Sequence, residues 1–168
     1  MKTLKLLNYS ADEWVAGDGS LSEVLSALTG EVIAETGSRG LDFKAMLDHA
    51  RNVGGPALRK MTFHERAWML KDLANAIMAR KEELYELYYS TAATRTDGWI
   101  DIEGGAGTLF SFSSKGRREL PNGRVLIDGA MEPLSKGGSF VGQHVFTPLH
   151  GVAVHINAFN FPVWGMLE

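Results

Sequence analysis

The sequence contains no cysteine among its 168 residues. This absence excludes disulfide bonds, thiolate metal sites and a cysteine nucleophile from the chain itself. No two histidines have the spacing that places ligands on one helix face, and no pair of carboxylates completes a ligand set. We therefore expect no metal site at the five histidines, which are His49, His64, His144, His150 and His155.

The chain also lacks a strong charge of either sign and a long hydrophobic run. Its 17 Lys and Arg and 20 Asp and Glu give a formal net charge of -3, without the basic patch typical of nucleic-acid-binding proteins. No apolar run reaches the roughly 18 to 20 residues that span a bilayer. The basic N-terminus is followed by polar residues from Asn8 onward, so we predict no secretory signal. We expect a cytoplasmic protein that binds neither nucleic acid nor membrane.

The first 40 residues have the pattern of short strands broken by turns. The segment 13–16 leads into Gly17-Asp18-Gly19, and Thr29-Gly30 precedes the apolar segment 31–34. The composition, with 45% hydrophobic and 22% charged residues, is typical of a globular domain. No internal repeat or flexible linker divides the chain.

Four helices are predicted between residues 43 and 113. Apolar residues at helical spacing indicate the first helix over 43–53, which Gly54-Gly55-Pro56 is expected to end. Thr62 and Glu65 fit a capping box at the start of the second helix, which runs to Arg80. A third helix follows from about residue 81. Its inward residues are predicted to be Leu84, Leu87 and Tyr88.

The fourth helix is predicted over 99–113, anchored by Trp99, Ile102, Leu109 and Phe110. It contains Gly104, Gly105 and Gly107, each of which weakens a helix by about 1 kcal/mol relative to alanine. Such glycines indicate that something packs closely against the helix backbone. No strand precedes them, which argues against a phosphate-binding loop. We interpret Asp101 and Glu103 as part of a solvated face.

From residue 120 the pattern changes to strands. Candidates are 124–127, followed by an Asp128-Gly129 turn, then 139–147 and 151–156. The last is almost entirely apolar, as expected for a strand buried on both faces of a parallel sheet, and His155 is predicted to pack within or beside it. Residues 157–161 form a loop before a helix that begins at Pro162. One strand and one unfinished helix are half of a βαβ unit, which predicts a truncated sequence.

The segment Gly151-Val-Ala-Val-His-Ile-Asn-Ala-Phe-Asn-Phe-Pro resembles the aldehyde dehydrogenase motif G-V-x-x-x-I-x-P-W-N-F-P. Residues 62–84 resemble the family's paired N-terminal helices, and residues 124–129 with the strand around His144 resemble its oligomerisation strands. The resemblance implies the N-terminal part of this α/β fold. Residues 1–119 would form N-terminal strands and helices, 120–150 the oligomerisation strands, and 151–168 the first strand, the catalytic-asparagine loop and an unfinished helix of the cofactor domain.

A subgroup of the family shares further segments with this sequence. Ala158-Phe159 replaces the common Pro-Trp, and Asp101-Ile-Glu-Gly-Gly, Arg117-Arg-Glu-Leu-Pro and Pro133-Leu-Ser-Lys are also similar to that subgroup. These are the bifunctional ring-opening proteins of phenylacetate degradation, with a semialdehyde dehydrogenase half and a hydratase-like half. The similarity implies a homo-oligomeric parent enzyme that oxidises a semialdehyde, in the form of a CoA thioester, with NAD or NADP.

The resemblance also implies roles for five consecutive residues. Asn160 corresponds to the family's catalytic asparagine, whose amide stabilises an oxyanion. From its spacing alone, an ordinary turn asparagine is the better interpretation, and the flanking Phe-x-Phe-Pro match favours the catalytic role. Ile156, Asn157, Ala158 and Phe159 correspond to positions near the nicotinamide, and ordinary packing at the end of a strand is the alternative. The cysteine and glutamate that complete this chemistry are not matched, so we expect the chain alone to be inactive. A non-catalytic module with only an assembly or binding role remains the alternative function.

Overall fold

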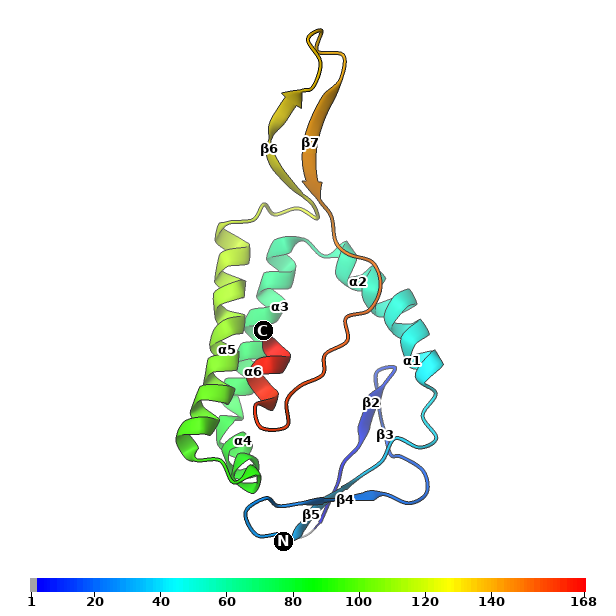
Figure 1. Cartoon of the computed structure of the whole chain (residues 1–168), viewed down its shortest axis with the longest axis vertical. Coiled ribbons are helices and arrows are strands. Elements are labelled where there is room, and N and C mark those ends of the chain that lie inside the picture. Colours follow the sequence, from blue (N-terminus) through cyan, green and yellow to red (C-terminus); the bar gives the residue numbers. More distant parts are fainter. Residues whose placement is uncertain (1–2) are drawn as a thin grey trace.

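The computed structural model describes residues 3–168, in which small sheets and one long hairpin flank a group of helices (Figure 1). In chain order the elements are β1 (Leu4–Lys5), β2 (Asn8–Ser10), β3 (Glu13–Val15), β4 (Ser22–Leu25), β5 (Val32–Thr36), α1 (Phe43–His49), the π-helical turn η1 (Ala50–Gly54), α2 (Gly55–Lys60), α3 (Phe63–Ala79), α4 (Lys81–Tyr88), the 3-10 turn η2 (Tyr89–Thr91), α5 (Arg95–Arg118), β6 (Leu126–Pro133), β7 (Val141–Phe146) and α6 (Pro162–Leu167). The mixture of helices and strands confirms the predicted α/β class.

The N-terminal strands form two separate sheets. Strand β5 lies between β1, which runs parallel to it, and β4, which runs antiparallel. Strands β2 and β3 form a hairpin whose turn residues Ala11 and Asp12 both have positive φ, the geometry that suits the twist of a two-residue turn. The predicted turn at Thr29-Gly30 is confirmed, with Gly30 at φ 74°.

The first helical segment does not end at Gly54-Gly55-Pro56, so that prediction is wrong. The chain passes through η1 and continues as α2, with the Gly55 N–H bonded to the Ala50 carbonyl five residues earlier. In a regular helix the Pro56 ring would clash with the carbonyl four residues back, and proline has no N–H to donate. The wider π-helical turn places Pro56 in the first turn of a new helix, where neither problem arises.

Helices α3 and α5 pack side by side and form the centre of the helical group (Figure 1). Small residues allow the close approach: Ala67 and Ala74 are buried on α3, and a Cβ added at Gly116 would lie 3.1 Å from the Ala67 Cβ. The predicted capping box of α3 is confirmed. The Glu65 N–H donates to the Thr62 hydroxyl at 3.2 Å, and the Thr62 N–H donates to the Glu65 carboxylate at 2.7 Å.

The packing of α4 and α5 differs from the prediction at three positions. Helix α5 begins at Arg95, after a second capping box formed by Thr94 and Asp97, and the predicted anchor Trp99 is exposed. Ile102 and Leu109 are buried as predicted. On α4, Leu87 is exposed, whereas Tyr85 is buried beside Tyr88 and Ile102. The tyrosine rings exclude water while their hydroxyl groups reach polar partners, a combination that apolar periodicity does not reveal.

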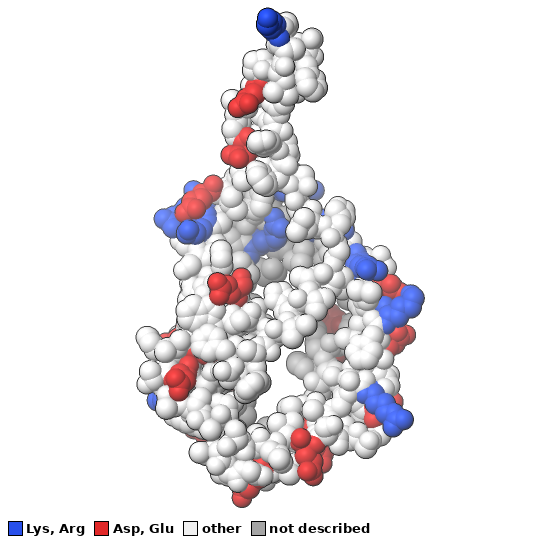
Figure 2. Space-filling model, viewed as in Figure 1, with Lys and Arg blue, Asp and Glu red and all other residues white. Residues whose placement is uncertain are grey.

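Strands β6 and β7 form a hairpin, residues 126–146, that projects from the helices; we refer to it as the β6–β7 arm (Figure 1). Asp128-Gly129 is not the predicted turn. The strand continues through it with a register shift between Asp128 and Glu132, and Gly129 has φ 77°. A glycine with positive φ is typical of a bulge that keeps the strand going. Figure 2 shows few charged side chains along the arm.

The predicted strand at 151–156 is wrong. These residues have no regular secondary structure, and no strand within residues 3–168 pairs with them. A strand requires a neighbour for its backbone groups, so apolar composition alone does not form one. His155 is exposed rather than packed against a sheet. Helix α6 begins at Pro162 as predicted. In the part of the chain described, no helix is both long enough and apolar enough to cross a membrane.

Candidate active site

Asn160 lies in an exposed turn just before α6. Its neighbours Ile156 and Phe159 are 92% and 89% exposed, so both side chains are free to contact another molecule or another part of a larger protein. The hydrogen bond across this turn joins the Phe161 N–H to the Ala158 carbonyl at 3.3 Å. This bond joins backbone atoms and does not involve the Asn160 side chain. Residues 156–160 are thus consecutive parts of one loop, which we call the Asn160 loop.

Tyr88 anchors the Asn160 loop from α4. Its hydroxyl group donates a hydrogen bond to the backbone carbonyl of Asn160 at 3.2 Å, across 72 residues of sequence. Tyr88 is buried, and burial together with the nearby Asp101 carboxylate raises the pKa of the Tyr88 phenol. The phenol therefore remains a protonated donor throughout the physiological pH range.

Asp101 holds the segment that follows the loop. Its two carboxylate oxygens accept hydrogen bonds from the Val163 N–H at 3.0 Å and the Trp164 N–H at 2.7 Å. These amides belong to the first turn of α6, where backbone N–H groups have no acceptor within their own helix. Asp101 has no exposed surface, so the prediction of a solvated position is wrong. The reason is that α6 covers this face of α5.

The glycines of α5 provide the surface on which α6 rests. A Cβ at Gly104 would overlap the Trp164 indole ring, and a Cβ at Gly105 would lie 3.0 Å from the Trp164 Cα. The prediction of a close neighbour is confirmed at these two positions. It is wrong at Gly107, where a Cβ would meet nothing within 4 Å. The Trp164 ring also stacks against Phe161, with centroids 5.9 Å apart.

Glu103 is also more constrained than the sequence indicated. It accepts a hydrogen bond from the Tyr85 hydroxyl at 2.7 Å and pairs with the Lys81 ammonium at 3.0 Å. The hydrogen bond from Tyr85 is the main cause that lowers the pKa of Glu103. Burial, and then this same bond, raise the pKa of Tyr85 to about 12. Glu103 lies on α5, as Asp101 does, and its contacts therefore link α5 to α4.

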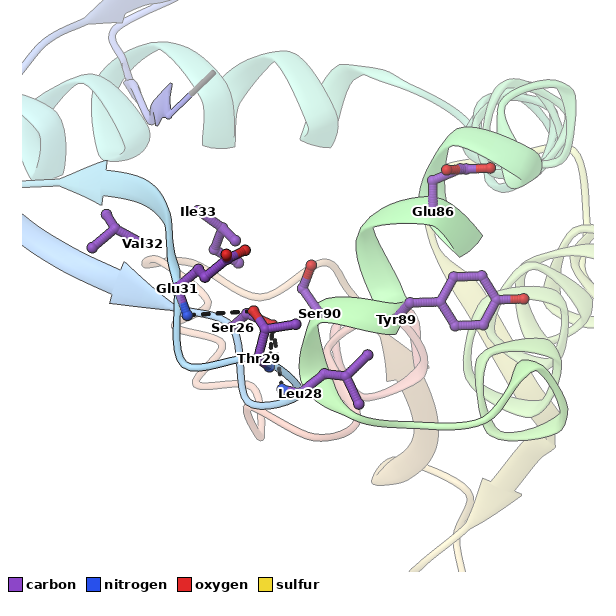
Figure 3. Close-up of a pocket in the computed structure, with 9 residues that line it drawn as sticks. All are labelled: Ser26, Leu28, Thr29, Glu31, Val32, Ile33, Glu86, Tyr89 and Ser90. Atoms are coloured by element: carbon purple, nitrogen blue, oxygen red, sulfur yellow. Dashed lines mark hydrogen bonds between the residues drawn. The ribbon is translucent and has the colours of Figure 1, made fainter. Parts of the chain in front are cut away.

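A separate cavity of about 510 Å³ lies between the β4–β5 turn and α4–η2 (Figure 3). The buried Ser26 hydroxyl accepts hydrogen bonds from the Leu28 and Thr29 amides at 3.2 Å, and the Ala27 N–H donates to the Ser90 carbonyl at 2.8 Å. The cavity shares no lining residue with the Asn160 loop. Phe159 instead lines a second, mainly apolar cavity of about 630 Å³ beside the N-terminal sheet.

Among residues 3–168, no group of three or more His, Cys, Asp or Glu side chains is arranged to hold a metal ion. The exposed carboxamide of Asn160 is a neutral donor suited to a developing negative charge on oxygen. The sequence predicted a role for Asn160 but did not reveal the residues that anchor its loop, Tyr88 and Asp101. The glycines of α5 were the one available signal for those contacts.

The chain belongs to the aldehyde dehydrogenase family, because a sequence model described as "Aldehyde dehydrogenase family" matches residues 14–167. This agrees with the resemblance found in the Asn160 loop. The chain is also similar to the 3,4-dehydroadipyl-CoA semialdehyde dehydrogenase of Aromatoleum evansii. The two are 38% identical over 166 residues, which is 98% of this chain and 32% of that protein. The chain thus spans about a third of the length of this curated relative.

Solved structures support the same fold. A lactaldehyde dehydrogenase matches with a TM-score of 0.64 and 18% identity, over 76% of this chain and 26% of that one. A 3,6-anhydro-L-galactose dehydrogenase in complex with NAP matches with a TM-score of 0.61 and 17% identity, over 75% of this chain and 26% of that one. At these identities the likeness shows the fold alone. It confirms that the chain has the fold of part of an aldehyde dehydrogenase.

Proposed function

We propose that the chain is the N-terminal part of an NAD(P)-dependent dehydrogenase that oxidises a CoA-linked semialdehyde in aromatic, phenylacetate-type catabolism. The observation that carries this proposal is the 38% identity, over 98% of the chain, to a 3,4-dehydroadipyl-CoA semialdehyde dehydrogenase. Family membership supports the oxidoreductase chemistry and the use of NAD or NADP. The substrate class rests on the named relative.

In this proposal each part of the chain has a separate task. Residues 1–119 form the strands and helices that support the Asn160 loop. Residues 120–150, which include the β6–β7 arm, join copies of the enzyme into a homo-oligomer. Residues 151–168 begin the cofactor domain. The exposed apolar side chains of the arm support the assembly role, because such surfaces on an isolated hairpin favour association.

Asn160 acts on the aldehyde oxygen. When a thiolate from elsewhere in the enzyme attacks the aldehyde carbon, the carbon–oxygen π bond breaks and its electrons move to oxygen. The Asn160 carboxamide then donates a hydrogen bond to that oxyanion, and loss of one such donor costs about 2.7–4 kcal/mol in the transition state. The exposed side chains of Ile156 and Phe159 offer an apolar surface for a flat ring, consistent with a nicotinamide beside residues 156–159. The bound nicotinamide would accept the hydride.

A second candidate function is a non-catalytic module that only binds or assembles. The absence of cysteine from the chain favours it. The two candidates differ in what the coding sequence contains after the codon for Glu168. An in-frame continuation with a cysteine and a glutamate in the family's positions selects the enzyme.

The substrate proposal is tested by comparing kcat/KM for a CoA-thioester semialdehyde and for acetaldehyde in the complete enzyme. We expect a strong preference for the CoA substrate, because binding energy from the remote CoA group can stabilise the transition state at the aldehyde carbon. Equal values for the two substrates would remove the CoA assignment and leave the family assignment intact.

The role of Asn160 is tested with two variants of the complete enzyme. Asn160→Ala removes the donor, and Asn160→Asp keeps the size of the side chain while replacing the donor with a charge that repels the oxyanion. We expect both to lower kcat by about 100- to 1000-fold with little change in cofactor affinity. A lower melting temperature with a near-normal rate per folded molecule would instead show that Asn160 has only a structural role.

A further inference from the structure

Asp101 is a fully buried carboxylate on α5 that the proposed chemistry does not use. Burial of a charged group is costly unless hydrogen bonds replace its water. The ion pairs formed within residues 3–168 do not include Asp101, and its oxygens are satisfied by the amides of Val163 and Trp164. Each oxygen of this carboxylate therefore holds an amide of the segment that begins three residues after Asn160.

Two further contacts fix the same segment. On the near side of the loop, the Tyr88 hydroxyl holds the Asn160 carbonyl at 3.2 Å. On the far side, the Trp164 backbone and ring lie against Gly104 and Gly105, one helical turn along α5 from Asp101. By contrast, the residues just before the loop have no regular structure, and Val154 is 80% exposed. The backbone around Asn160 is thus held from α4 and α5 rather than by the chain that leads into it.

We propose that Asp101 is a positioning residue, which orients the Asn160 carboxamide by holding the first turn of α6. This inference rests on the proposed oxyanion role of Asn160. Asp101 touches neither substrate nor cofactor in this proposal, and it acts through the backbone of residues 163–164 that it holds. Its contribution is geometric, because a displacement of about 1 Å at a catalytic group lowers a rate by about 100-fold.

The test uses the complete enzyme with Asp101→Asn and Asp101→Ala. Asparagine keeps the volume and one acceptor oxygen but turns an NH2 group toward one of the two backbone N–H donors; alanine removes both acceptors. We expect kcat to fall by about 10-fold or more for Asp101→Asn and further for Asp101→Ala, with the cofactor Kd and the aldehyde KM within about two-fold of wild type. Hydrogen exchange should rise in the peptide 157–168, whereas the amides of α3 stay protected.

Glu103→Gln provides the matched control. Glu103 is a carboxylate two residues away on the same helix, but its partners are Lys81 and Tyr85 rather than the backbone of the loop. We expect Glu103→Gln to lower the melting temperature without changing kcat per folded molecule or the exchange of residues 157–168.

A double-mutant cycle identifies the route by which Asp101 acts. If Asp101 acts through Asn160, Asp101→Asn introduced into Asn160→Ala should cause little further loss of kcat. Additive losses would overturn the proposal, as would an Asp101→Asn enzyme that melts lower but keeps its rate per folded molecule. If Asp101→Ala does not fold, the nearly isosteric Asp101→Asn decides the question.

Failure of the underlying function gives a different pattern. If Asn160→Ala alone keeps its rate, the oxyanion role is wrong, and exchange in 157–168 still reports whether Asp101 holds this segment. Unchanged exchange in Asp101→Asn would overturn the anchoring itself.

Discussion

Gly104→Ala is expected to leave the protein no more stable than wild type, or less stable by up to about 2 kcal/mol, although alanine favours helices. Alanine gains about 1 kcal/mol over glycine inside a helix. At Gly104, however, the new Cβ would lie 2.5 Å from the Trp164 Cε3, whereas favourable carbon–carbon contacts begin at about 3.5 Å. The indole ring must move by about 1 Å, away from its stacking contact with Phe161 and its hydrogen bond to Glu168 at 3.1 Å. Such overpacking costs about 1–3 kcal/mol, which cancels or exceeds the helix gain.

Gly107→Ala is the matched control, because the same substitution three residues later in the same helix meets open space. There only the helix gain applies, so we expect stabilisation by up to about 1 kcal/mol. The two variants should therefore differ by about 1–3 kcal/mol in the free energy of unfolding. Urea titration followed by far-ultraviolet circular dichroism measures this difference directly. If Gly104→Ala is stabilised as much as Gly107→Ala, the packing of Trp164 on α5 described above is wrong.

Other features of the chain lead to three further predictions. The lowered pKa of Glu103 means that its bonds stabilise the fold fully above its ordinary value of 4.5 and lose that effect as the pH falls through the folded value. The stability difference between wild type and Glu103→Gln should thus shrink in acid; a difference that grows below pH 4.5 would contradict this. The isolated chain should associate or aggregate through the β6–β7 arm, whose exposed residues include Ile127, Phe140 and Phe146. Light scattering that shows a monomer with a cooperative melt would count against association. The purified chain should reduce no NAD(P), because it holds no thiol nucleophile, and formation of NAD(P)H above a mock preparation would disprove this.

Local signals in the sequence were sufficient where the contacts are local. The capping box at Thr62 and Glu65 was predicted because both partners lie within one turn. The start of α5 was missed because Asp97, rather than Glu or Gln, completes its capping box, and the apolar pattern becomes visible only later. Pro56 was predicted to end the first helix. A π-helical turn instead removes the steric clash and the missing hydrogen bond by which proline usually ends a helix.

Other features of the site and fold depend on contacts between residues that are far apart in the sequence, which the sequence pattern does not show. Asp101 reads as a solvated acid because its partners lie 62 and 63 residues later in the sequence. The composition of segment 151–156 is typical of a buried strand. A strand forms only when another strand pairs with it, and the apolar pattern of a segment does not show whether such a partner is present. The role of Asn160 was predicted from its motif, whereas its hydrogen bond from Tyr88 depends on a contact across 72 residues. The catalytic role of Asn160 stays a prediction.

The packing of α6 against α5 also limits which chimeric proteins can be built from members of this family. A chimera with its junction anywhere between β7 and α6 would take Trp164 from one parent and Asp101, Gly104 and Gly105 from the other. A parent with a larger side chain at either glycine position would displace the incoming tryptophan, and one without an acceptor at position 101 would leave two amides unpaired. Segment exchange within this family should therefore succeed when α5 and α6 are inherited together, and junctions upstream of Arg95 meet that condition.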